Sequence, residues 1–178
     1  MHAALWAITG LILMLLGLAG LVILIGLALP RGHTATSRAV VSATPEAVWE
    51  ALTDYESMPQ WRPELTRVEP LADGRRGWIE HSKFGRLPMV IETAEAPRLL
   101  VGRIADDKLP FGGTWTYRLE PEGESRTAVS ITEDGEVYNP MFRFISRFIM
   151  GYNGTMDAYL RNLGRKFGAE VEPEHVAR

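Results

Sequence analysis

The chain has 178 residues, which is enough for one domain with a sizeable core and one further segment. It contains no cysteine, so disulfides, thiolate metal sites and cysteine nucleophiles are excluded. The net charge of −3 argues against nucleic acid as a partner, because domains that bind nucleic acid are typically basic.

The N-terminal stretch from Ala3 to Leu29 has no charged residue and is rich in leucine, isoleucine and alanine. It exceeds both the roughly 20 apolar residues that cross a bilayer and the roughly 7–15 of a secretory signal core. We therefore predict a single-pass transmembrane anchor over residues 1–30. Arg31 and Arg38 follow this anchor, and because basic flanks favour the cytoplasmic side, the rest of the chain is expected in the cytoplasm.

A strand and two short helices are predicted next. Thr34 to Ala43 is rich in β-branched residues and alternates roughly between apolar and polar. Thr44 and Pro45 then suit the N-cap and first turn of a helix. The stretch 54–63 predicts a second short helical element, limited in length by its prolines.

From Leu65 to Tyr138 the sequence predicts a meander of antiparallel strands. Turn signals rich in glycine separate short runs in which apolar and polar residues alternate, most clearly over 114–119. One apolar face and one polar face are typical of an antiparallel sheet that is covered on one side only.

A long C-terminal helix is the predicted cover for this sheet. Asn139 and Pro140 form a helix start, and apolar residues then recur at three- and four-residue steps from Met141 to Phe167. Gly151 and Gly154 each cost roughly 1 kcal/mol inside a helix, so a bend or break is expected near them. The remaining residues, 169–178, form a polar tail that is expected to fray.

The arginines of this helix fall on the side opposite its apolar stripe. From Asn139 to Gly168 there are five basic residues and one acid, although the whole chain is acidic. We interpret Arg143 and Arg147 as a membrane-facing surface for anionic lipid headgroups. The alternative is an ordinary solvated face of the helix.

Together, the order of elements resembles the START-like helix-grip proteins of the SRPBCC superfamily, of the polyketide cyclase/dehydrase and lipid transport type. Three segments carry the resemblance: TPEAVWEALTDYESMPQWRP at 44–63, GGTWTYRLEP at 112–121 and TEDGEVYNPMFRFISRFIMG at 132–151. The resemblance implies an α+β fold over residues 31–168, in which a curved antiparallel sheet of about seven strands wraps around the C-terminal helix. It also implies a deep apolar cavity between the sheet and this helix, which would hold a lipid or another hydrophobic small molecule.

Nine large side chains fall on inward faces by periodicity and are the candidate ligand-binding residues. They are Trp61, Trp78, Met89, Ile91, Trp115, Tyr117, Phe144, Phe148 and Tyr152. The alternative is that these side chains fill the core and leave no cavity.

The sequence offers little for catalysis. Glu80 and His81 are the candidate acid or base residues within the strands, although His81 shares a face with Lys83 and is expected to be exposed. No metal-ligand spacing and no cofactor motif is present, so neither a metal nor a cofactor is predicted. The leading hypothesis is a membrane-anchored module that binds or transfers a hydrophobic molecule. A cyclase- or dehydratase-like enzyme and a scaffold whose long helix meets an unidentified protein partner remain as alternatives.

Overall fold

The structure of the chain is a computed structural model that describes residues 2–176. The helical elements are α1 (His2–Ala28), α2 (Pro45–Thr53), η1 (Tyr55–Ser57), α3 (Met58–Trp61), α4 (Pro140–Ile145), η2 (Ser146–Met150) and α5 (Gly154–Lys166). The strands are β1 (Gly32–Val41), β2 (Leu65–Pro70), β3 (Gly77–Ser82), β4 (Gly85–Glu95), β5 (Leu99–Ile104), β6 (Phe111–Pro121), β7 (Thr127–Val137) and β8 (Glu174–His175).

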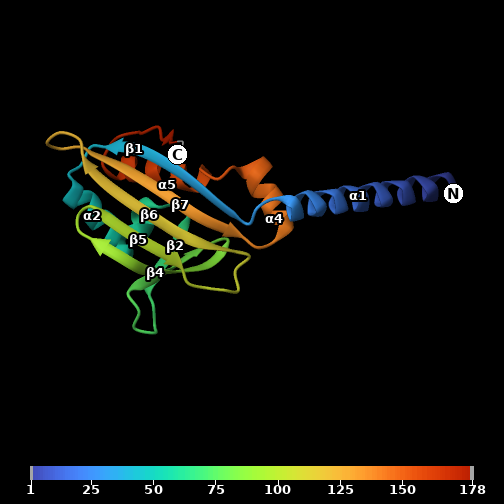
Figure 1. The fold of residues 1–178 in the computed structure, drawn as a ribbon, viewed down its shortest axis with the longest axis horizontal. Helices are drawn as coiled ribbons and strands as arrows, with labels where there is room; N and C mark the ends of the chain where they lie inside the picture. The colour runs from blue at the N-terminus through green and yellow to red at the C-terminus, as the bar shows by residue number, and fades with distance from the viewer. Residues whose placement is uncertain (1, 177–178) are drawn as a thin grey trace.

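The eight strands form one antiparallel sheet in the order β2-β3-β4-β5-β6-β7-β1-β8, which confirms the predicted meander. The sheet curves around α5, with α2 and α3 beside it, while α1 projects from one end (Figure 1). Gly32 pairs with Glu136 at the α1 end of the sheet, and Val41 pairs with Thr127 at the far end.

The C-terminal tail is not frayed over its described part, in contrast to the expectation. Strand β8 pairs with β1 through Ser37 and Arg38. The His175 Nε2 atom also lies 2.9 Å from Asp157 of α5, whose other carboxylate oxygen accepts a hydrogen bond from Ser37. The tail therefore ties α5 to the edge of the sheet.

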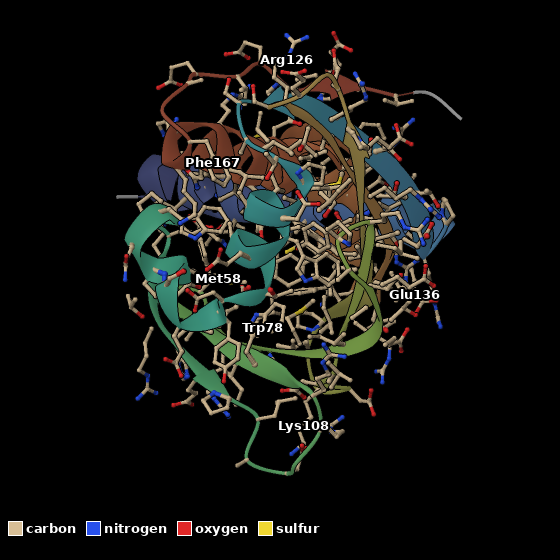
Figure 2. The ribbon with its side chains drawn as sticks, turned by 90° about the vertical axis from the view of Figure 1, so that its left-hand side faces the viewer. Met58, Trp78, Lys108, Arg126, Glu136 and Phe167 are labelled. Carbon is tan, nitrogen blue, oxygen red and sulfur yellow. The ribbon has the colours of Figure 1, made fainter. Side chains whose placement is uncertain are left out.

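The inner face of the sheet is most tightly packed at its far end. Val41, Val129 and Leu119 on the strands and Leu160 and Leu163 on α5 are almost completely buried. Burial of these apolar side chains supplies the main stabilisation of the fold. In Figure 2, Met58 and Trp78 point into this interior, whereas Lys108 and Glu136 lie at the periphery.

The predicted long helix is divided into α4, η2 and α5. It begins as predicted, because the Asn139 side chain accepts hydrogen bonds from the backbone N–H groups of Met141 and Phe142. It breaks at Gly151, whose φ of 73° lies in the left-handed region that favours glycine. Only α5 packs inside the curved sheet, whereas α4 lies against the last part of α1 (Figure 1). The prediction of one apolar stripe that faces the sheet is therefore wrong for the first half of the stretch, where Phe148 is 59% exposed.

Arg143 is buried and not on an exposed helix face, contrary to the expectation. Its Nη1 atom donates hydrogen bonds to the carbonyl oxygens of Gly26 (3.0 Å) and Leu29 (3.1 Å) at the end of α1. Its Nη2 atom donates to the carbonyl oxygen of Tyr138 (3.0 Å). The last carbonyl groups of a helix have no partner within the helix, so this guanidinium caps α1. Arg147 is exposed, as predicted.

Candidate functional site

An aromatic cluster centred on Tyr159 occupies the space between the sheet and α5. The Tyr159 ring lies 5.3 Å from Trp61 in an edge-to-face arrangement, and 6.0 Å and 5.6 Å from Trp115 and Tyr117. Burial raises the pKa of the Tyr159 and Tyr117 hydroxyls, so both stay protonated. Tyr159 was missed by the sequence analysis, although it lies three residues after Met156 on the same apolar stripe.

The nine predicted ligand-binding residues fall into two groups. Six line the interior: Trp61, Trp78, Met89, Ile91, Trp115 and Tyr117. The other three lie at the α1 end of the molecule. There the rings of Phe144 and Phe148 pair with each other at 5.0 Å, and Tyr152 stacks on His33 of β1 at 3.9 Å. Phe144 and Phe148 precede the break at Gly151, and Tyr152 lies in the short link between this break and α5, so the structure does not gather the whole predicted set.

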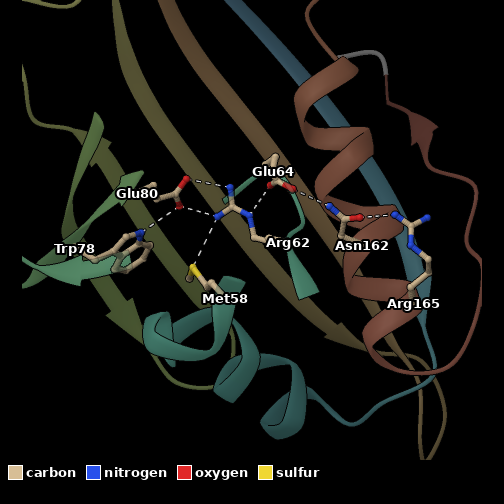
Figure 3. Close-up of polar contacts among 7 residues, drawn as sticks. All are labelled: Met58, Arg62, Glu64, Trp78, Glu80, Asn162 and Arg165. Atoms are coloured by element: carbon tan, nitrogen blue, oxygen red, sulfur yellow. Dashed lines mark hydrogen bonds and ion pairs between the residues drawn. The ribbon is translucent and has the colours of Figure 1, made fainter. Parts of the chain in front are cut away.

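A buried ion pair joins α3 to the sheet. The Arg62 guanidinium donates hydrogen bonds to both carboxylate oxygens of Glu80, at 2.6 and 2.9 Å, and both residues are buried (Figure 3). The Trp78 indole N–H donates a further hydrogen bond to Glu80 at 3.1 Å. Burial by itself would lower the pKa of Arg62, but the Glu80 carboxylate outweighs burial and raises it.

The same network reaches α5. Arg62 also donates a hydrogen bond to Glu64 at 2.8 Å, and Asn162 of α5 donates to the other oxygen of Glu64 at 3.2 Å. Arg165 in turn donates to the Asn162 side chain (Figure 3). A chain of polar contacts therefore crosses the domain from β3 to α5.

This geometry gives no support to the two predicted catalytic residues. Glu80 faces the interior, but both of its carboxylate oxygens already accept hydrogen bonds from Arg62, and one also accepts a hydrogen bond from Trp78. His81 lies on the opposite face of β3, where its Nε2 atom is 2.9 Å from Glu69 and 3.2 Å from Arg67. Among the described residues, no three histidine, aspartate or glutamate side chains are grouped to hold a metal ion.

Glu133 is an inward carboxyl that the sequence analysis missed. It lies on β7 between Ala35 of β1 and Trp115 of β6, and it follows Val129 and Ile131 on the same face. Burial raises its pKa, while a hydrogen bond from Trp115 opposes the rise. Extending the alternation of β7 by two residues would have found it. A carboxyl that holds its proton more firmly can donate a hydrogen bond inside an apolar site.

We expect Glu133→Gln to stabilise the folded domain increasingly as the pH rises. The folded state binds a proton at Glu133 more readily than the unfolded state, so this group contributes stability at low pH. That contribution is lost as the pH rises above the ordinary value of 4.5 and through the higher folded value. Denaturant unfolding at acidic and neutral pH measures the difference, with Glu120→Gln on the exposed outer face as the control. If the free energies of unfolding of wild type and Glu133→Gln differed by the same amount at both pH values, this prediction would be contradicted.

A hollow of about 650 Å³ lies at the α1 end, lined mainly by outward-facing residues of β1, β5, β6 and β7, and it is not the predicted apolar cavity. Its charged lining consists of Arg103, Asp106, Asp107, Asp134 and Glu136. A second hollow of about 260 Å³ lies beside β5 and β6 and is also lined by charged residues. The aromatic cluster around Tyr159 lies elsewhere, between the sheet and α5.

The inner face nevertheless differs between its two ends. Ile91, Ile104 and Trp115 belong to the α1 half of the inner face, and all three are only partly buried. Their neighbours Ala35 and Gly102 are small, and Gly102 pairs directly with Trp115. Apolar surface of the interior therefore remains accessible on the side toward α1, whereas the far end is sealed.

Comparison with known proteins agrees with this architecture. The family described as "Polyketide cyclase / dehydrase and lipid transport" matches residues 32–168. A search of curated proteins finds no match.

Several solved structures share the fold at low sequence identity. A START superfamily protein from Mycobacterium smegmatis is 18% identical, with a TM-score of 0.61 over 76% of this chain and 97% of that one. A conserved protein from Geobacillus kaustophilus is 12% identical, with a TM-score of 0.66 over 80% and 100%. Norcoclaurine synthase from Thalictrum flavum is 13% identical, with a TM-score of 0.59 over 76% and 86%.

Proposed function

Because the chain belongs to the polyketide cyclase/dehydrase and lipid transport family of the SRPBCC superfamily, we propose that it binds a hydrophobic small molecule such as a lipid. The molecule would lie between the curved sheet and α5, and α1 would hold the domain at a membrane with the domain in the cytoplasm. The observation that carries this proposal is the partly exposed apolar surface of Ile91, Ile104 and Trp115 on the inner face of the curved sheet. Such surface gains free energy when an apolar ligand removes it from water.

The site also has a polar end. Glu133 lies beside Trp115, and burial favours its protonated form. A protonated carboxyl in an apolar surrounding can pair with a hydroxyl or carbonyl of a ligand, and unpaired polar groups there would be costly. We therefore expect a ligand that is mainly apolar but carries one polar group.

The proposal of a membrane anchor is supported by the way in which α1 is attached to the domain. Residues Trp6–Ala28 are the one helix in the described part of the chain that is long and apolar enough to cross a membrane, and they are mostly exposed. A signal sequence near the N-terminus can also meet these criteria of length and hydropathy. The last turn of α1, however, packs on α4, and Arg143 takes its hydrogen-bond acceptors from Gly26 and Leu29. Removing α1 would leave this buried guanidinium without two of its partners, so retention of α1 is favoured.

Ligand binding is tested by filling the interior. Gly102 faces inward, and a Cβ atom there would lie 3.3 Å from Cε at the end of the flexible Met89 side chain and 4.0 Å from the Val90 carbonyl oxygen, so Gly102→Leu should fold while occupying the space beside Trp115. Val101→Leu, on the outer face of the same strand, is the matched control. Both variants and wild type are purified in the same detergent, extracted with organic solvent and analysed by mass spectrometry.

Lipid that surrounds α1 is common to all three preparations, so the difference between them isolates interior-bound material. We expect one apolar species in wild type and Val101→Leu that falls at least several-fold in Gly102→Leu. Equal extracts from all three proteins would refute binding between the sheet and α5.

A further inference from the structure

We propose that α4 and η2 form a membrane-contact surface that enters the bilayer interface beside α1. The surface consists of Met141, Phe142, Phe148, Ile149 and Met150 and is called the α4–η2 surface below. The inference rests on the proposed anchor, but it concerns a part of the chain outside the ligand site. It assigns a lipid surface as the partner of these side chains.

The α4–η2 surface exposes large apolar side chains in an unusual concentration. Its five members are between 44% and 71% exposed, and all lie within ten consecutive residues. Outside α1, only four other large apolar side chains in the described part of the chain are exposed: Phe84, Phe111, Tyr138 and Val176. Contiguous exposed apolar surface on a folded domain marks an interaction site.

The contact between α4 and α1 places this surface at the level where a bilayer would begin. Gly26 of α1 is buried against Pro140, close enough that a Cβ atom there would lie 1.9 Å from the Pro140 carbonyl oxygen. Arg143 fixes the same contact through its hydrogen bonds to Gly26 and Leu29. Figure 1 shows α4 directly beside the end of α1 that enters the domain. A membrane that surrounds α1 must therefore meet α4 and η2.

The charge of this segment suits anionic lipid headgroups. No acidic residue occurs from Asn139 to Met156, although the chain as a whole has a net charge of −3. Exposed Arg147 lies within η2, and exposed Arg31 lies three residues after the end of α1. Apolar side chains flanked by arginines are typical of segments that lie in the headgroup region. A second copy of the chain would also cover apolar surface, but the continuity with α1 and the basic charge favour the bilayer.

The absence of cysteine makes a direct test possible. Single variants Ile149→Cys and Ser125→Cys are made in the full chain, labelled with an environment-sensitive NBD fluorophore and reconstituted into phosphatidylcholine/phosphatidylglycerol nanodiscs. Ser125 is exposed in the β6–β7 turn at the far end of the sheet, so it serves as the control. Lipids with a doxyl group near the headgroup then quench any probe at the interface.

We expect blue-shifted emission and several-fold stronger quenching for the probe at position 149 than for the probe at position 125. Equal, water-like emission at both positions would overturn the inference, as would disulfide-linked dimers of the unlabelled Ile149→Cys protein together with absent quenching. Adding Gly102→Leu to the labelled Ile149→Cys chain separates the proposed ligand site from the proposed membrane contact. Loss of the interior ligand should leave the quenching at position 149 unchanged. A chain that fails to enter the nanodiscs would overturn both the anchor and the α4–η2 surface.

Discussion

Replacing Arg62 by methionine should destabilise the folded domain by about 3–5 kcal/mol, because it leaves the Glu80 carboxylate buried without its partner. Two hydrogen bonds from the guanidinium would be lost at once, together with the contact that links α3 to Glu64 and α5. Methionine preserves much of the apolar stem of arginine, so the loss of the charge dominates the effect. Equilibrium denaturation of the full chain in detergent measures the change in unfolding free energy.

Two further variants show whether the buried charge is the cause. Adding Glu80→Gln to Arg62→Met should restore part of the lost stability, since the glutamine carries no charge and still accepts the hydrogen bond from Trp78. Arg103→Met removes a comparable arginine–glutamate pair with Glu92 on the outer face, where both side chains are 41% exposed. That variant should cost less than about 1 kcal/mol. Equal losses of unfolding free energy in Arg62→Met and Arg103→Met would contradict the prediction that breaking the buried pair costs more than breaking the exposed pair.

The elements of the fold could be predicted because their signals are local. Alternation over 114–119 identified β6, and the Thr44 N-cap, which accepts a hydrogen bond from the Ala47 backbone N–H, marked the start of α2. The family resemblance over 44–63 and 132–151 then supplied the order in which the strands and α5 assemble. These are properties of neighbouring residues, so one sequence was sufficient.

The features that the sequence analysis missed depend on contacts between distant residues. The partner of Arg62 is 18 residues away on β3, and two of the three acceptors of Arg143 are more than 110 residues away, at the end of α1. Periodicity placed Arg143 on a polar helix face but could not show that α1 would cover that face. The apolar stripe of the sequence likewise continues through the break at Gly151. Apolar residues such as Phe144 and Phe148 suit a protein core and a membrane equally, so the pattern alone could not show which of the two surrounds them.

The contact between α1 and α4 yields the second large effect: Gly26→Leu should separate these helices, whereas Gly20→Leu should not. A Cβ atom at position 26 would lie 1.9 Å from the carbonyl oxygen and 2.6 Å from the carbonyl carbon of Pro140, and backbone atoms cannot yield as a flexible side chain can. At Gly20 nothing lies within 4 Å of the added Cβ atom. Both changes add the same apolar side chain to the same helix, so insertion of α1 into a membrane is preserved in each.

Amide hydrogen exchange over 139–150 reports the separation. Overpacking of this kind costs about 1–3 kcal/mol, which corresponds to roughly 5- to 150-fold faster exchange in α4 for Gly26→Leu. Arg143→Met should act in the same direction, because three backbone carbonyl oxygens lose a charged donor. If amide exchange over 139–150 in Gly26→Leu matched the wild-type rate, the contact between Gly26 and Pro140 would not hold α4 on α1. The two parts would then be joined only through the chain at Pro30, and α4 would have no fixed position relative to the membrane. Faster exchange confined to Gly26→Leu and Arg143→Met would instead mean that the anchor and the grip domain are held together by side-chain contacts.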